Sequence, residues 1–210
     1  MSIVPTMTFA VVNLAWQRDD RGREKELLDE LRKHADVILA IETVDSPMKR
    51  MLGRWKVWQP QRTEGAKNNT VAVHPRVRTG YRGARVAVDP DGLEMRTRWL
   101  AWRRVYLAGA PIRGGACHRP PPRFRRLWAA FDAVVVRWLR RPTPAVLGLD
   151  ANAVDLPSLT RPTGYDWVHS GIMGALVSPQ LKVLRTRTMR MPASDHDILL
   201  ITVAWRRNRA

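Results

Sequence analysis

The sequence of 210 residues contains a single cysteine, Cys117, and no long uncharged apolar run. One cysteine excludes an internal disulfide and is typical of a protein in a reducing compartment. No apolar segment is long enough to span a bilayer, and no apolar stretch follows a basic start of the chain. We therefore expect a cytoplasmic protein without membrane contact, in which Cys117 is a buried and unreactive thiol.

Acidic side chains are also scarce, since 19 Asp and Glu stand against 36 Lys and Arg, which gives a formal net charge of +17. The excess is concentrated in residues 51–145, which hold 20 basic and 5 acidic side chains, whereas residues 1–50 hold 8 and 9. Such a clustered charge attracts polyanions and favours association with nucleic acid. Arg outnumbers Lys 30 to 6, so a G+C-rich genome or a merely solvated surface is the alternative explanation. We expect nucleic acid, DNA in particular, as the partner.

Chain length and apolar patterning predict one domain, residues 1–205, followed by a basic tail, residues 206–210. Helical apolar spacing occurs in segments 21–34 and 123–141, and a short helix or turn leads into a strand within 48–58. Short β-branched or Leu-rich runs predict strands at 8–13, 37–42, 70–74, 85–88, 94–107, 110–118, 175–178, 181–188 and 198–204. Many strands with two good helices predict an α+β fold, a monomeric sandwich of two sheets with helices outside.

Polar clusters stand at the ends of several of these strands. They are Asn13 after 9–12, Glu42 after 37–41, Asp150 and Asn152 after 145–149, and Ser194, Asp195 and His196 before 198–203. Strands of one sheet layer can bring their ends together, however far apart they lie in the sequence. Carboxylates, amides and an imidazole at such a place form a site for a hard metal ion with a proton-transfer group beside it. This pattern indicates cleavage of a phosphate ester.

The chemistry of the individual residues supports that interpretation. Glu42 offers hard oxygen to Mg²⁺, or to Mn²⁺ in its place, and Mg²⁺ keeps several waters and needs only one or two protein carboxylates. Asp150 and Asn152 are two residues apart, so they point to one side of an extended segment. The carboxylate can orient or deprotonate a water, and the amide can donate to that water or to a phosphate oxygen. A carboxylate after an apolar buried run is costly unless it serves a purpose.

With these residues in place, the chain resembles the endonuclease/exonuclease/phosphatase superfamily, which has the DNase I-like fold. The matching segments are Val11–Asn13, Leu39–Glu42, Ala116–Pro121, Gly148–Asn152 and Ser194–Asp197. Each motif alone is weak, but five in the family's order at strand ends cover nearly the whole chain. The resemblance implies that Asn13, His118, Asp150, Asn152 and His196 are catalytic and that Glu42 and Asp195 bind the metal ion.

One position departs from the family's pattern. The family usually carries an Asp in the strand before the final motif, where it orients the last histidine, but here the segment Gly171–Gly174 places Met173 there. A thioether accepts hydrogen bonds only weakly, so His196 would be less firmly held and activity would be reduced. Asp166 is the alternative orienting carboxylate.

Taken together, these features predict a Mg²⁺-dependent phosphodiesterase, an endonuclease or exonuclease that attacks the nucleic-acid backbone directly with water. Arg119, Arg123, Arg125 and Arg126 follow His118 and are the expected phosphate contacts. Two alternatives remain open at this point. The first is a phosphatase of inositol phospholipids or another small phosphoester. The second is a nucleic-acid-binding module that keeps the fold and has lost turnover.

Overall fold

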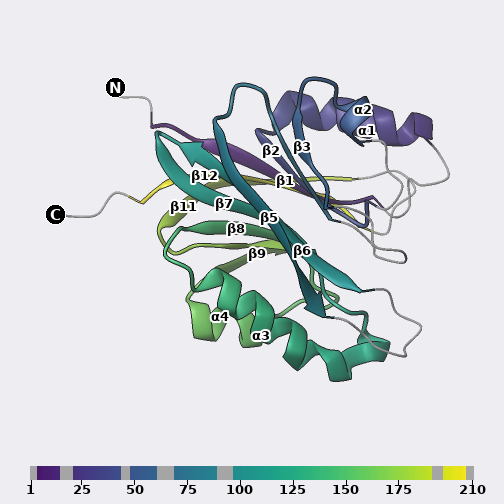
Figure 1. The fold of residues 1–210 in the computed structure, drawn as a ribbon, viewed down its shortest axis with the longest axis vertical. Coiled ribbons are helices and arrows are strands. Elements are labelled where there is room, and N and C mark those ends of the chain that lie inside the picture. Colours follow the sequence, from purple (N-terminus) through teal and green to yellow (C-terminus); the bar gives the residue numbers. More distant parts are fainter. Residues whose placement is uncertain are drawn as a thin grey trace.

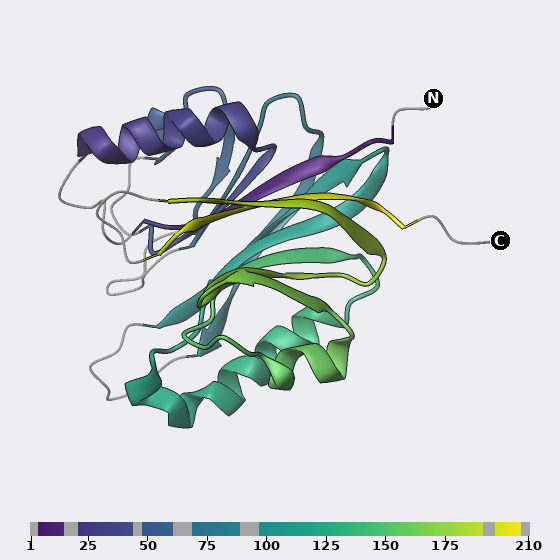
Figure 2. The ribbon, with the colours of Figure 1, turned by 180° about the vertical axis from the view of Figure 1, so that it is seen from behind.

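The structure, a computed structural model, describes residues 4–14, 21–43, 48–60, 69–88, 97–190 and 196–206. In this part of the chain, two mixed six-stranded sheets pack face to face. Helices cover the outer face of each sheet, so the molecule has four layers (Figure 1, Figure 2). The predicted two-sheet sandwich is confirmed.

The first sheet has the strand order β11-β12-β1-β2-β4-β3. Its strands are β1 (Met7–Asn13), β2 (Val37–Ile41), β3 (Lys56–Trp58), β4 (Thr70–Val73), β11 (Leu181–Met189) and β12 (Ile198–Trp205). Helices α1 (Arg21–His34) and α2 (Met48–Met51) lie on its outer face (Figure 2). β1 and β2 are parallel, whereas the other neighbouring strands run antiparallel.

The second sheet has the strand order β5-β6-β7-β8-β10-β9. Its strands are β5 (Thr79–Val88), β6 (Arg98–Leu107), β7 (Ala110–His118), β8 (Ala145–Asp150), β9 (Asp166–Ser170) and β10 (Met173–Val177). Its outer side carries the 3₁₀ helix η2 (Pro122–Leu127), α3 (Trp128–Leu139) and α4 (Pro157–Thr163). β7 and β8 are its parallel pair.

Alternation along the strands divides the apolar side chains among three layers of core. Phe9, Val11 and Leu39 of the first sheet meet Ile112 and Val146 of the second sheet, and all five are fully buried. A second core layer lies under α3 and a third under α1. Because the middle layer joins the two sheets, the ends of their strands are held at a fixed spacing.

The sequence-based boundaries fail where proline and glycine interrupt the apolar pattern. A single helix over 123–141 is wrong, since the segment divides into η2 and α3, and η2 is itself kinked at Phe124 (φ −111°, ψ 30°) just after three prolines. Helix α4 falls in a segment for which no helix was predicted, because Pro162 lies inside it. β5 begins at Thr79 rather than Arg85, since Gly80 and Gly83 obscure the strand. Gly83 is needed there, because a Cβ would lie 2.4 Å from the ring of Trp102.

Cys117 is buried, as expected, and burial raises the pKa of its thiol. It therefore stays protonated and contributes to the core as a small apolar side chain. None of the helices in the described ranges combines the length and apolarity needed to cross a bilayer.

The close approach of the two sheets generates a first prediction. A Cβ added at Gly148 would lie 2.8 Å from the Cβ of Leu39, whereas one added at Gly114 would meet nothing closer than 3.5 Å. Gly148→Ala should therefore lower the free energy of unfolding by about 1–3 kcal/mol, because the sheets must separate. Gly114→Ala, its matched control on the neighbouring strand, should be neutral or slightly stabilising.

Urea unfolding of both variants beside the wild type measures this difference. Equal stability of the two variants would show that the sheets are not held at a fixed spacing at Gly148.

Candidate active site

The site lies where the two parallel strand pairs end. In the first sheet, Asn13 is the last residue of β1 and Glu42 directly follows β2. In the second sheet, His118 and Asp150 are paired at the ends of β7 and β8. The Nδ2 atom of Asn13 donates to Oδ2 of Asp150 at 3.0 Å, so a hydrogen bond joins the two sheets at this edge.

Asp150 is the centre of the cluster. Its side chain is 3% exposed, and its Oδ2 lies 3.6 Å from Nε2 of His118 and 3.7 Å from Nε2 of His196. Its Oδ1 accepts the backbone N–H of Asn152 at 3.2 Å. Two imidazoles and two amide donors thus surround one carboxylate, which fixes its orientation.

His118 connects Asp150 and Asn152 with Glu42. Its Nδ1 lies 3.1 Å from Oε1 of Glu42, and its Nε2 lies 3.0 Å from Nδ2 of Asn152. The same amide of Asn152 donates to the carbonyl of Arg119 at 2.8 Å. The side chains of Glu42 and Asn152 thus hold the ring of His118 at both of its nitrogen atoms. These contacts hold the ring between the ends of the two sheets.

Arg98 is a member of the site that the sequence did not reveal. It is 5% exposed at the start of β6, and its Nη1 lies 3.6 Å from Oε1 of Glu42 and 3.0 Å from Nδ1 of His118. Burial lowers the pKa of Arg98, while nearby Glu42 and Asp150 oppose that change. The signal was hidden because Arg98 fell inside a strand predicted to begin at residue 94, among many other arginines.

Two residues of the site have left-handed backbone conformations. Glu42 has φ 57° and Asn152 has φ 50°, and Ala108 in the β6–β7 turn is the other such non-glycine residue in the described ranges. Asn tolerates this region, but for Glu it costs of order 1 kcal/mol. The strain turns the carboxylate of Glu42 toward the second sheet instead of continuing the strand.

Only part of the final predicted motif belongs to the described residues. His196 is described and lies beside Asp150, but Asp195, predicted to bind the metal ion, lies outside the described residues. Within the described ranges, no three His, Cys, Asp or Glu side chains form a ready metal cage. Mg²⁺ keeps most of its bound waters in proteins, so one carboxylate with neighbouring oxygen atoms is enough to bind it. Glu42 beside Asn13 and Asp150 is a donor set of that chemistry.

Met173 pairs in register with Asp150 and is 1% exposed in the core between the sheets. Asp166 does not replace the missing orienting carboxylate, and that suggestion is wrong. It pairs with Val177 at the far end of β10, is exposed, and contacts Arg206 at 3.5 Å. Among the described residues, Asp150 lies close to the ring of His196, with its Oδ2 3.7 Å from Nε2.

The position of Arg119 contradicts its expected role as a phosphate contact. It is 4% exposed, its guanidinium is paired with the buried carboxylate of Asp132 on α3, and it stacks 3.9 Å from the ring centre of Trp128. Its backbone N–H donates to the carbonyl of Asp150 at 2.9 Å. Arg119 thus supports the site from behind, whereas Arg123, Arg125 and Arg126 are exposed on η2.

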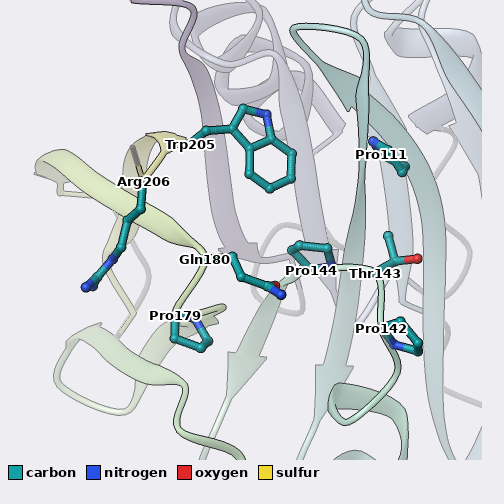
Figure 3. Close-up of a pocket in the computed structure, with 8 residues that line it drawn as sticks. All are labelled: Pro111, Pro142, Thr143, Pro144, Pro179, Gln180, Trp205 and Arg206. Carbon is teal, nitrogen blue, oxygen red and sulfur yellow. The ribbon is translucent and has the colours of Figure 1, made fainter. Parts of the chain in front are cut away.

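A cavity of about 640 Å³ lies at the opposite end of the strands (Figure 3). Its walls come from the starts of β7 and β8 and the end of β12, and include Pro111, Pro144 and Trp205. The indole of Trp205 is fixed by a hydrogen bond to the carbonyl of Leu107. The cavity holds none of the clustered carboxylates and imidazoles, so it is not the candidate active site.

The fold places the chain among known structures, although no family model and no curated protein matches its sequence. An endonuclease/exonuclease/phosphatase from Bacteroides vulgatus is 13% identical, with a TM-score of 0.76, over 96% of this chain and 99% of the other. ANGEL2, a 2′,3′-cyclic phosphatase, is 12% identical, with a TM-score of 0.73, over 96% of each chain. A mannosyl-6-phosphatase from Bacteroides thetaiotaomicron is 15% identical, with a TM-score of 0.68, over 95% of this chain and 100% of the other.

The chain therefore has the fold of the endonuclease/exonuclease/phosphatase superfamily, as the five motifs predicted. Phosphoester hydrolysis is the activity that the names of these neighbours have in common.

The buried pair of Arg119 and Asp132 generates a second prediction. Removing the guanidinium leaves a carboxylate buried without a counterion, and one of its oxygens already lacks a partner. Arg119→Met should lower the free energy of unfolding by about 3–5 kcal/mol, whereas Arg123→Met, an exposed control, should change it by less than about 0.5 kcal/mol. Chemical denaturation measures both values. Unchanged stability of Arg119→Met with weakened DNA binding would return Arg119 to the phosphate-binding surface.

Proposed function

We propose that the protein is a Mg²⁺-dependent phosphodiesterase that hydrolyses the backbone of nucleic acid by direct attack of water. The observation that carries the proposal is the position of Asp150, whose Oδ2 lies within 3.7 Å of nitrogen atoms of Asn13, His118 and His196. A fixed carboxylate can accept a proton from water, and the fixed donors around it can stabilise negative charge on a phosphate.

In the proposed reaction, Asp150 orients the attacking water and takes one of its protons. The water oxygen attacks phosphorus in line, and the bond to the leaving oxygen breaks as the new bond forms. His196 donates to a non-bridging oxygen, and the leaving alkoxide takes a proton from solvent. Asn13 and Asn152 hold Asp150, while His118 holds Glu42, so no covalent enzyme intermediate is required.

Glu42 and Asp195 are the proposed holders of Mg²⁺, for which Mn²⁺ can substitute. When bound, the ion supplies positive charge to the phosphate oxygens and lowers the pKa of water. Arg98, buried beside Glu42, adds a permanent positive charge on the same side of the site.

The proposal of nucleic acid as substrate is supported by charge. The formal net charge is +17, and Arg123, Arg125 and Arg126 are exposed on η2, a few residues after His118. Among the ion pairs of the described residues, none joins a carboxylate to these three side chains. An exposed guanidinium without a carboxylate partner is suited to a phosphate backbone, which it contacts without reading the bases.

Hydrolysis of a small phosphoester is the second candidate, because one structural neighbour is a mannosyl-6-phosphatase. A binding module without turnover is the third, because Met173 stands where the superfamily has an Asp. Purified protein is incubated with supercoiled plasmid, RNA, a phosphoinositide and a sugar phosphate, each with Mg²⁺ or with EDTA. Nucleotide release separates the first candidate, phosphate release the second, and binding without product the third.

Replacement of the central carboxylate is the third prediction. Asp150→Asn keeps the shape of the side chain and removes its ability to accept a proton. It should reduce the Mg²⁺-dependent rate of plasmid nicking by roughly 10²–10⁴-fold. Asp155→Asn, the same change at an exposed position five residues later, should leave the rate unchanged. An Asp150→Asn variant that nicks at the wild-type rate would remove Asp150 from the chemistry.

The salt dependence of binding is the fourth prediction. Replacing Arg123, Arg125 and Arg126 with Gln should lower the slope of log affinity for duplex DNA against log salt by roughly 0.9 for each phosphate that is no longer neutralised. The matched control replaces Arg185, Arg187 and Arg190, which are exposed on or just after β11, with the same change in charge. Equal slopes in the two triple variants would mean that only net charge counts and that η2 is not the contact surface.

A further inference from the structure

The long edge strand β5 presents an unusual surface. β5 is the outermost strand of the second sheet, so one of its backbone edges is unpaired within the sheets. Tyr81 on this strand is 69% exposed, and Arg82 beside it is also exposed, as is Arg78 just before the strand. Neither Trp99 nor Trp102 of the neighbouring strand reaches solvent to this degree, so Tyr81 is the accessible aromatic ring of this edge.

Positive charge is crowded around this edge. Arg82 pairs in register with Arg103 of β6, and like charges directly opposite each other are destabilising. Arg103 donates to the carbonyl of Lys56 on β3 and to the hydroxyl of Thr79, but its Nε has no partner. Burial, with a smaller contribution from the charge of Arg82, lowers the pKa of Arg103. The cluster therefore has an electrostatic cost that a bound anion would offset.

Few acidic side chains relieve this charge in the described residues nearby, where Asp36 pairs with Arg76. Residues 48–60, 69–88 and 97–131 contain sixteen Lys and Arg and no Asp or Glu. The exposed guanidinium groups stack on aromatic rings instead. Arg82 lies 4.5 Å from the ring centre of Trp58, and Arg78 lies 4.6 Å from that of Tyr106. Stacking holds the guanidinium plane in place and leaves its N–H groups available at the rim for phosphate oxygens.

The strand also leads to the active site. Thr79 at its start pairs with Val105, whereas Val88 at its end pairs with Arg98, whose guanidinium contacts Glu42 and His118. Ten residues of strand cover about 30 Å. In Figure 1, β5 and β6 cross the molecule as neighbouring long strands. A polymer that follows β5 therefore reaches the catalytic edge at its end.

We infer that Arg78, Tyr81, Arg82 and Arg103, here called the β5 track, bind a single-stranded nucleic acid. The exposed ring of Tyr81 can stack only on a base that is free of its own helix, whereas the duplex keeps its bases inside. Adjacent strand residues point to opposite faces, so the nucleic acid lies across the free edge of β5, with a base on Tyr81 and phosphates at Arg78 and Arg82, and its backbone continues toward Asp150. This inference rests on the proposed function, which makes nucleic acid the substrate. It adds that the substrate is single-stranded and that it also binds at a surface away from the active site.

The test measures binding and chemistry separately. Fluorescence anisotropy gives the affinity for labelled oligothymidine and oligouridine of roughly 4, 8 and 16 nucleotides, over a range of salt. The variants are Tyr81→Ala, Tyr81→Phe and the double variant Arg78→Gln with Arg82→Gln. The control for the double variant is Arg185→Gln with Arg187→Gln on β11, the far edge of the other sheet. The rate of hydrolysis of bis(p-nitrophenyl) phosphate, an ester too small to reach the β5 track, measures the activity of the active site alone. The melting temperature of each variant shows whether it is folded.

Tyr81→Ala should weaken binding of the longer oligonucleotides roughly tenfold, and Tyr81→Phe should restore it, because stacking needs only the ring. The arginine pair should lower the salt slope by roughly 0.7 for each phosphate that is no longer neutralised, while the β11 pair has a smaller effect. Hydrolysis of the small ester should stay at the wild-type rate. Comparison of the two homopolymers distinguishes DNA from RNA.

Three results would overturn the track. They are unchanged affinity of Tyr81→Ala, an equal decrease in the β5 and β11 pairs, and absence of oligonucleotide binding by the wild type at low salt. The proposed function fails in a different way. If oligonucleotides bind through Tyr81 and are not cleaved, the track stands and the nuclease does not. If they are cleaved equally well by Tyr81→Ala, the nuclease stands and the track does not.

Discussion

The hydrogen bond between Asn13 and Asp150 depends on the distance between the two sheets, and the site is built around it. Neither sheet carries the site alone, because Asn13 and Glu42 belong to the first sheet and His118 and Asp150 to the second. Apolar packing between the sheets sets the separation, and Gly148 against Leu39 shows how little room it leaves. The geometry of the candidate site is therefore a consequence of core packing as much as of the polar residues themselves.

Much of the site was readable from the sequence because its residues follow apolar strands. A strand end can be located from the apolar run before it, and parallel neighbours bring their ends to one edge. Asn13, Glu42, His118, Asp150 and Asn152 are of this kind, and the structure places all five together. Arg98 could not be found in this way, since it begins its strand, and only the pairing of β6 with β7 brings it to His118.

The arginines show a second limit of sequence-based inference, because composition does not separate structural from exposed cations. Arg113 is buried, and its guanidinium donates to backbone carbonyls of Trp138 and Thr143 at and beyond the end of α3. Burial lowers its pKa to about 10. It acts as a cap for the negative end of that helix, as Arg119 acts as a partner for Asp132. The charge offered to a polyanion is therefore smaller than the net charge of the chain suggests.

Residue 119 joins the outer helical layer to the catalytic edge. Its side chain is tied to Asp132 and Ser158 on α3 and α4, its N–H is bonded to Asp150, and its carbonyl is bonded to Asn152. A small displacement of α3 is thereby transmitted to two groups of the site without any contact with substrate. Buried side chains of the outer helices, Asp132 above all, therefore bear on the position of Asp150 and Asn152 although they lie outside the cluster.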